Sequence, residues 1–429
     1  MIAVMLFGLL LLLLITGMPI AVAMGSTAMI VLSVMVPNTN LTVVPQRLFT
    51  AIDSFSLTAV PFFILAGAIM EKGGISKRLV GFAKLLFSWL PAGLSCITIA
   101  ASAFFGAISG SNPATVAAIG GIMVPEMTKS GYSKEDAATV VAAAGTLGVV
   151  IPPSIPMVTY AIMASVSVGT LFVSGFVPGI LLALVLMVIS IVRYGKTELR
   201  VHERISIRQF FSTLLDAMWA IIMPVIILGG IYGGFFTPTE SAAVACVYAF
   251  IVSKFIYREL DALSIRDLFK DAAINTSAIL FLVSFAAPFS WLMASQGVTQ
   301  MIADAVLSFF SHRISILLVM NLMLLFLGLF LDTLSIVLLV TPILLPIATQ
   351  IQLDPIVLGL IIVVNTSIGM ITPPMAMNMF VAGRISNTPI EAMSRRIIPF
   401  LLGELAVLLV MTYVPDVVLF LPRALGMVA

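Results

Sequence analysis

Long apolar runs alternate with short charged clusters along the whole chain. A helix needs about 20 apolar residues to cross a bilayer, and the runs of this kind are 3–36, 49–70, 168–192, 214–233, 238–256, 273–295 and 396–414. The charged clusters between the runs are 71–78, 129–136, 193–208, 254–271 and the group Arg384, Arg395 and Arg396. Because Lys and Arg accumulate in cytoplasmic loops, we place these clusters in the cytoplasm and the segments 37–48 and 237–240 on the opposite side.

This sidedness predicts a hairpin that does not cross the membrane. The run 49–70 ends in the cytoplasm, and the next cluster, 129–136, is also cytoplasmic. The segment 92–128 between them must therefore enter and leave on one side. We expect a re-entrant helical hairpin whose tip is the sequence SGSNPAT at 109–115.

The same reasoning predicts a second hairpin of opposite orientation. A broken helix over 135–163 crosses outward, and after the outward span 273–295 the hairpin 314–351 enters from the outside, with its tip at 331–333. A second broken helix, 356–383, then crosses inward.

The two halves are related in sequence by an offset of 221 positions. The aligned pairs are Pro125 with Pro346, Gly148 with Gly369, Pro152 and Pro153 with Pro373 and Pro374, and Pro178 with Pro399. Inverted repeats that contain broken helices are typical of secondary transporters. The predicted fold class is an all-α polytopic membrane protein with inverted-topology repeats.

Three weaker segments carry charges on an apolar background and predict interfacial amphipathic helices, with ordinary loops as the alternative. They are 79–90, 205–211 and 298–312. The apolar start, 2–16, has no basic residues before it and runs on to Val36, so we interpret it as a retained span and not a signal peptide.

Composition supports a membrane protein and excludes several other classes. Of 429 residues, 61% are hydrophobic and 9% charged, with a mean hydropathy of +1.20, which leaves too little charge to cover a soluble surface. The net charge of +2 does not favour nucleic acid as a partner. Cys96 and Cys246 stand in apolar sequence and read as core residues, while His202 and His312 lack metal-ligand spacing.

The first break offers oxygen ligands at membrane depth. Gly148 and the pair Pro152-Pro153 interrupt a helix and free backbone carbonyls, which lipid tolerates only where they line a cavity or bind a cation. The hairpin tip adds the hydroxyls of Ser109 and Ser111 and the amide of Asn112. Neutral hard oxygens suit Na⁺. The alternative is that these residues only pack helices together. Two breaks at matching positions argue against this alternative.

The second break repeats the pattern with one acidic residue. Asp332 and Thr333 stand at the hairpin tip, and the carbonyls lie around Gly369, Thr372 and Pro374. Asp332 has three possible roles: it ligates a cation, takes a proton, or caps its helix. Helix N-termini at both tips can hold an anionic substrate.

Other charges in apolar sequence have open interpretations. Glu404 can pair with another helix or with a partner subunit. Arg384 can bind a substrate carboxylate or anchor its helix at the interface. Glu240 follows Pro238, so we expect it to stabilise a helix N-terminus that Thr237 or Thr239 caps.

Five motifs together resemble the large membrane subunit of TRAP transporters, the tripartite ATP-independent periplasmic carriers. They are SGSNPATVAAIG (109–120), GTLGVVIPPS (145–154), FFTPTESAA (235–243), LGLFLDTLS (327–335) and IGMITPPM (368–375). The resemblance implies an elevator-type carrier of the ion-transporter superfamily in the bacterial inner membrane. It also implies a separate small four-helix membrane subunit, a periplasmic substrate-binding protein, and Na⁺-driven uptake of organic acids such as dicarboxylates or sialic acid.

The resemblance also implies site residues. The first Na⁺ site falls on Ser109, Ser111, Gly148, Ile151 and Pro153, together with Asn112 from the tip, and the second on Asp332, Thr333, Gly369, Thr372 and Pro374. Expected substrate-binding residues are Ser111, Ser154, Asn378 and Arg384. No catalytic residue and no cofactor beyond the coupling ion Na⁺ is expected.

The resulting division has seven parts. They are scaffold helices (1–70), an arm helix (79–90), a first transport half with its following span (91–192), scaffold helices with cytoplasmic loops (193–295), a second arm helix (298–312), a second transport half (313–383) and the last span with the C-terminus (384–429).

Three other function classes compete with this one. An H⁺-coupled or binding-protein-independent anion carrier of the same superfamily differs only in coupling and partners. A membrane-embedded enzyme would need convergent titratable groups, and the sequence offers isolated ones. A passive channel or scaffold would not need hairpins that enter from both sides.

Overall fold

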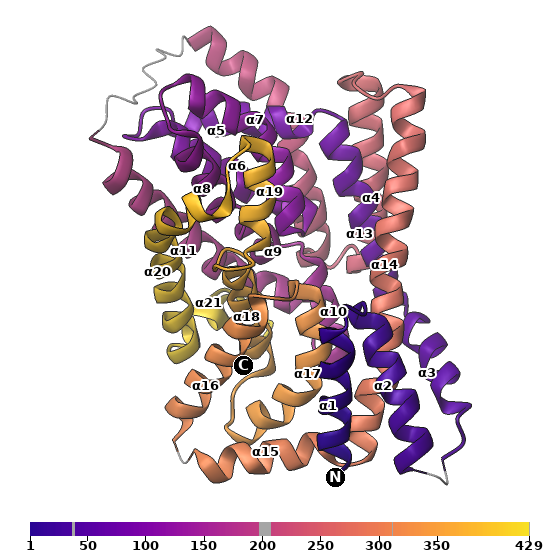
Figure 1. The fold of residues 1–429 in the computed structure, drawn as a ribbon. Helices are drawn as coiled ribbons and strands as arrows, with labels where there is room; N and C mark the ends of the chain where they lie inside the picture. Colours follow the sequence, from indigo (N-terminus) through magenta and orange to yellow (C-terminus); the bar gives the residue numbers. More distant parts are fainter. Residues whose placement is uncertain (37–38, 197–206, 311, 429) are drawn as a thin grey trace.

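The computed structural model describes residues 1–36, 39–196, 207–310 and 312–428, and all regular structure in these ranges is helical (Figure 1). Eight helical stretches there are long and apolar enough to span a membrane: 55–72, 134–164, 168–194, 210–232, 238–256, 263–295, 333–350 and 390–413. The chain is therefore a multi-pass membrane protein.

The N-terminal region differs from the expected single span over 3–36. It forms two helices that pack side by side, α1 (Ile2–Ile15) and α2 (Ile20–Met35). Gly17 between them has a φ of +82°, and Pro19 has no N–H to continue the first helix. Both helices are shorter than a bilayer crossing requires, so the prediction of one span is wrong.

The next run is also divided. The expected span 49–70 becomes α3 (Val43–Ile52), a short 3₁₀ turn (Phe55–Thr58) and α4 (Ala59–Lys72). The helices α12 (Ile207–Tyr232), α13 (Pro238–Ile251) and α14 (Ala262–Ser295) follow the expected spans, and α13 continues into a π-helical turn (Val252–Ile256). Thr237 and Glu240 form the expected capping box at the start of α13.

The first repeat contains a helical hairpin and a broken helix where the sequence predicts them. The hairpin is α6 (Gly93–Ser109) and α7 (Asn112–Lys129). The broken helix consists of α8 (Lys134–Ala144), α9 (Leu147–Val150) and α10 (Ile155–Ala164). The long helix α11 (Val168–Tyr194) follows.

The second repeat has the same elements in the same order. They are the hairpin α16 (Arg313–Gly328) and α17 (Thr333–Gln350), the broken helix α18 (Pro355–Gly369) and α19 (Met377–Ser386), the long helix α20 (Ile390–Tyr413) and a terminal helix α21 (Asp416–Ala424). The helices α7 and α17 begin and end at positions that differ by 221, so the sequence offset is also the structural one.

The two hairpins lie at opposite ends of the molecule. Figure 1 shows α5 (Ile75–Phe87), α6 and α7 near the top and α15 (Val298–Phe309), α16 and α17 near the bottom. Each hairpin is preceded by a short helix, α5 or α15, where an interfacial helix is predicted. The third such prediction, 205–211, is not a separate helix: residues 207–211 begin α12, and 205–206 lie outside the described residues.

The helices pack in two groups that also contact each other, since α4 contacts α6 and α10, and α14 contacts α17. The helix α14 contacts α2, α3 and α4, and α13 contacts α4 and α12. The hairpins and broken helices contact one another and also α11 and α20. The helix α5 joins the groups, because Arg78 pairs with Glu259 and Asp216 on one side while Lys84 pairs with Glu126 of α7 on the other.

Candidate ion and substrate site

The two hairpin tips meet beside α14. A cavity of about 170 Å³ lies between them, and its lining includes Ser111 and Asn112 of the first tip, Asp332 and Thr333 of the second, and Ile279 of α14. Residues that are 221 positions apart in sequence thus face one cavity.

Asn112 connects the two repeats through its buried side-chain amide. Its Nδ2 donates to Ser367 Oγ at 2.7 Å, and its Oδ1 accepts from the Val149 N–H at 2.9 Å. Ser367 Oγ in turn donates to the Thr146 carbonyl at 2.8 Å. Because a buried amide is costly to leave unpaired, Asn112 fixes the first tip against both breaks.

The predicted ligands of the first Na⁺ site lie close together. A side chain on Gly148 would place its Cβ 2.6 Å from the Ser111 carbonyl oxygen, and one on Gly110 would lie 3.2 Å from the Pro153 carbonyl oxygen. Ser109 Oγ lies 2.9 Å from Thr115 Oγ1. The break continues through Ile151, which has an extended backbone (ψ of 123°). The tip and the break thus bring their backbones into direct contact.

The predicted ligands of the second Na⁺ site are brought together in a similar way. The α-carbon of Gly369 lies against Gly328, since a Cβ built on Gly369 would come within 2.5 Å of the Gly328 α-carbon. Thr333 Oγ1 lies 3.6 Å from Met370 Sδ, and Thr372 Oγ1 donates to the Ile368 carbonyl at 2.9 Å. Pro374 lies in the turn after α18, and the Pro373-Pro374 bond is cis, as is Pro152-Pro153.

Asp332 caps its own helix. Its carboxylate accepts from the backbone N–H groups of Leu334 and Ser335 at 3.1 and 3.2 Å, and from the Ser335 hydroxyl. The capping role left open by the sequence is therefore present in the structure. A carboxylate at this position offsets the partial positive charge of the α17 N-terminus.

Two other helix N-termini at the cavity have no such cap. Ser111 is the N-cap of α7 and Ser154 the N-cap of α10, and within the described chain neither side chain makes a capping hydrogen bond. Ile155, the first residue of α10, lines the same cavity as Ser111. The first-repeat side of the cavity thus presents uncapped N–H groups, which favour an anion.

The expected substrate residues do not all lie at this cavity. Ser154 is fully buried, and its Oγ has no hydrogen-bond partner among the described residues. Asn378 is also buried, and its backbone N–H donates to the Met370 carbonyl at 2.9 Å. Arg384 is exposed, stacks on Phe380 with 5.5 Å from guanidinium carbon to ring centroid, and lines a separate cavity of about 520 Å³.

A further cavity of about 420 Å³ separates the first tip from the α4–α14 side. Ser109 and Ser111 line it from the tip, Glu71 from α4 and Asn275 from α14. Sequence reasoning did not select Glu71 or Asn275, because both look like ordinary residues at the ends of spans. Their contribution depends on how the spans pack, which no local pattern encodes.

Thr146 and Ser367 were also missed, although a signal for them existed. They occupy equivalent positions in the repeats, 221 apart, and small hydroxyl residues at matched positions beside both breaks point to a shared polar contact.

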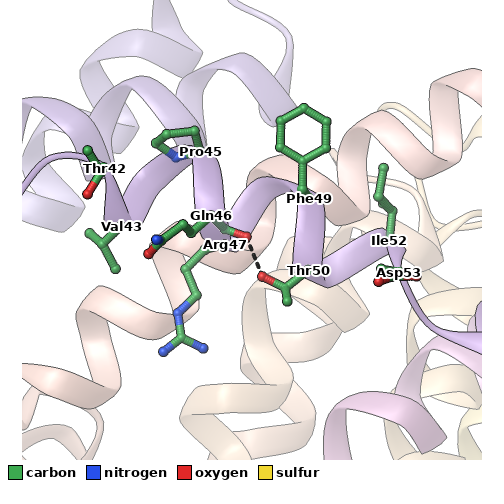
Figure 2. Close-up of a pocket in the computed structure, with 9 residues that line it drawn as sticks. All are labelled: Thr42, Val43, Pro45, Gln46, Arg47, Phe49, Thr50, Ile52 and Asp53. Carbon is green, nitrogen blue, oxygen red and sulfur yellow. Dashed lines mark hydrogen bonds between the residues drawn. The ribbon is translucent and has the colours of Figure 1, made fainter.

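A larger cavity lies away from all these residues. It has a volume of about 1020 Å³ and lies along α3. Figure 2 shows the residues that line it, which include Arg47, Phe49 and Asp53. Arg47 lies over the ring of Trp291 at 5.5 Å. None of the predicted site residues lines this space.

Paired hairpins whose tips meet two broken helices, in a multi-pass helical protein with internal repeats, define the class of secondary transporters. The comparisons with known proteins agree. The family model described as "Tripartite ATP-independent periplasmic transporter, DctM component" matches residues 7–417. The chain belongs to this family of large permease subunits and is a transport protein and not an enzyme.

The relatives carry different substrate names. The chain is 43% identical to the isethionate TRAP transporter permease DctMQ of Oleidesulfovibrio alaskensis, with 97% of this chain and 65% of the relative covered. It is 38% identical to the C4-dicarboxylate large permease DctM of Rhodobacter capsulatus (99% and 100% covered). It is 34% identical to the sialic acid large permease SiaM of Vibrio cholerae (96% and 96% covered).

A solved structure supports the fold. The YdaH transporter of Alcanivorax borkumensis superposes with a TM-score of 0.64 over 85% of this chain and 86% of that chain, at 13% identity. At this identity the likeness concerns the fold alone.

Proposed function

We propose that this chain is the large permease subunit of a Na⁺-coupled carrier that takes up an organic acid anion across the bacterial inner membrane. One observation supports it above others: the uncapped N-termini of α7 and α10 face a cavity that also gathers hydroxyl and amide oxygens from both tips, beside the capping carboxylate of Asp332. Helix N-termini favour an anion, and neutral oxygens favour a monovalent cation.

The substrate class follows from the relatives and from this asymmetry. The named substrates of the relatives, C4-dicarboxylate, sialic acid and isethionate, are all organic anions. In the described chain the carboxylate of Asp332 already offsets the partial positive charge of the α17 N-terminus at the second tip. We therefore place the anionic group of the substrate nearer Ser111 and the N-terminus of α10, and the coupling ions at the backbones of Gly148 and Gly369.

Two partners complete the proposed carrier. The family is the large component of a tripartite system, so we propose a small four-helix membrane subunit and a periplasmic substrate-binding protein as the other components. This chain covers 65% of the relative DctMQ, so the rest of that relative lies outside the matched region.

We further propose that the hairpins are re-entrant and that the carrier works as an elevator. The polar tips are costly in lipid unless they stay packed on their breaks, so moving the assembled site as one body avoids exposing them. The packing of α11 and α20 on the broken helices supports including both in the moving body, with α5 and α15 as its arms. Structures open to each side that showed only a tip moving would refute this.

Reconstitution tests the coupling. Purified permease with its small subunit is placed in liposomes, and uptake of labelled dicarboxylate is measured with the binding protein outside and a Na⁺ or a proton gradient imposed. We expect uptake only with both the Na⁺ gradient and the binding protein. Uptake driven by a proton gradient alone, or without the binding protein, would establish the alternative carriers instead.

A further inference from the structure

A buried carboxyl group lies next to the first break without a cationic partner. Glu404 is in the middle of α20 and has no exposed surface. Its Oε1 lies 2.7 Å from Thr146 Oγ1, and its Oε2 has no hydrogen-bond partner among the described residues. A buried charge without a partner is strongly unfavourable.

The hydrogen bonds of Thr146 indicate which form the carboxyl takes. Thr146 Oγ1 lies 2.7 Å from Glu404 Oε1 and also 2.7 Å from the Ala143 carbonyl oxygen. The hydroxyl has one hydrogen and can donate to only one of these acceptors. If Glu404 is protonated, its O–H donates to Thr146 Oγ1 and Thr146 donates to Ala143, so both contacts become hydrogen bonds. If Glu404 is ionised, one contact is repulsive.

The charged groups on the helices that pack against α20 lie near helix ends. The sequence of α18 has none. Counting the titratable tyrosines as well, they are Lys134, Glu135 and Asp136 on α8, Arg193 and Tyr194 on α11, Arg384 on α19, Glu391, Arg395, Arg396 and Tyr413 on α20 itself, and Asp416 and Arg423 on α21. Arg396 is two helical turns from Glu404, about 12 Å along the axis, and pairs with Asp136 at 2.7 Å. Among the described residues, none forms an ion pair with Glu404.

The repeat comparison shows that the fold does not require an acid here. The position equivalent to Glu404 in α11 is Ala183, 221 residues earlier. Glu404 is therefore a feature of one half only. Through Thr146 it connects to Ser367 and Asn112, because the Thr146 carbonyl accepts from Ser367 Oγ and Ser367 accepts from Asn112.

We propose that Glu404 is a proton-binding site inside the permease, and that its bound proton positions Thr146 and the first break. Ionisation replaces the Glu404–Thr146 hydrogen bond with an uncompensated charge, loosens the break and slows transport. Glu404 is a positioning residue, since it acts on the first tip through Thr146 and Ser367. Transport is therefore lost at alkaline pH. The transport readout rests on the proposed function, whereas the spectroscopic one does not.

Uptake is measured in proteoliposomes with equal pH on both sides and a fixed Na⁺ gradient. Wild-type uptake should fall roughly tenfold per pH unit above the pH at which the site releases its proton. Glu404→Gln, which keeps the hydrogen bond without a titrating group, should retain neutral-pH uptake within about twofold and lose the alkaline decline. The control Glu391→Gln, an exposed carboxylate at the start of α20, should follow the wild type.

Infrared spectroscopy tests the proton without transport. The C=O stretch of a protonated carboxyl should be present in the wild type and absent in Glu404→Gln, and Thr146→Val should shift it upward by removing the hydrogen bond. Either variant suffices if the other does not fold. The proposal is overturned if the wild type lacks the carboxyl band or if Thr146→Val leaves the band unshifted. It is also overturned if a folded Glu404→Gln protein has no uptake or keeps the alkaline decline. A wild type without Na⁺-driven uptake that keeps the band would instead refute the proposed function.

Discussion

The contact between the first tip and the first break makes Gly148→Ala the most informative substitution. The new Cβ would lie 2.6 Å from the Ser111 carbonyl oxygen, 2.9 Å from the Ser111 carbonyl carbon and 2.6 Å from Thr115 Oγ1. Thr115 can change rotamer, but the Ser111 backbone cannot yield without moving the tip. Overpacking of this kind costs about 1–3 kcal/mol.

The displaced backbone belongs to Ser111, whose hydroxyl is a proposed ion ligand, and it lies at the proposed ion position beside Gly148, so we expect the cost to fall on Na⁺ binding. A loss of 1–3 kcal/mol corresponds to roughly a 5- to 150-fold increase in the Na⁺ concentration for half-maximal effect. The assay is Na⁺-dependent thermal stabilisation of the purified permease, followed by Na⁺-dependent uptake. Thermal stabilisation reports binding even when transport is lost.

Gly121→Ala is the matched control. Gly121 lies in α7 of the same hairpin, and a Cβ there meets nothing within 4 Å. Alanine in a helix interior is favourable, so this variant should keep the wild-type Na⁺ dependence. If Gly148→Ala binds Na⁺ as tightly as the control, the backbone contact is not part of the ion site and the reasoning fails.

Three other predictions use independent readouts. Membrane-impermeant maleimide on spheroplasts should modify Gln352→Cys and spare Gly131→Cys; labelling of both or neither would refute the inverted topology. Ser111→Ala and Thr333→Ala should each raise the half-saturating Na⁺ concentration several-fold, because each removes one ligand worth about 1 kcal/mol, and two unchanged values would place the ions elsewhere. Asn112→Ala leaves the Val149 N–H and Ser367 without their partner and should destabilise the permease by about 1–3 kcal/mol; an unchanged melting temperature would contradict the linking role.

The sequence predicts the hairpins and broken helices well because their signals are repeated. The tip residues and the Gly/Pro breaks each occur twice, and the second occurrence tests the first. The bounds of α7 and α17 coincide with the 221-residue offset.

The N-terminal region was predicted poorly for a physical reason. The turn between α1 and α2 carries no charge, only Gly17 and Pro19, and both residue types are common inside membrane helices. Apolarity alone does not distinguish one long helix from two short ones that pack together.

The polar contacts of the site could be predicted least. The sequence predicts that Asn112 belongs to an ion site, but it contains no sign that the amide of Asn112 bonds to Ser367 and Val149. Arg384 lines a different cavity from the tips. Such outcomes depend on distances between elements far apart in the chain, which neither periodicity nor spacing contains.

The hydrogen bond between Ser367 and Thr146 joins two positions that are equivalent in the repeats. This bond therefore joins the two repeats directly, at matching positions of their breaks. In a symmetric pair the Thr146 hydroxyl would face the Ser367 backbone in return, but it faces Ala143 and Glu404 instead. The two halves therefore differ at the contact that joins them. A substitution at Thr146 or Ser367 therefore affects both repeats at once, because each residue is bonded to its equivalent in the other half.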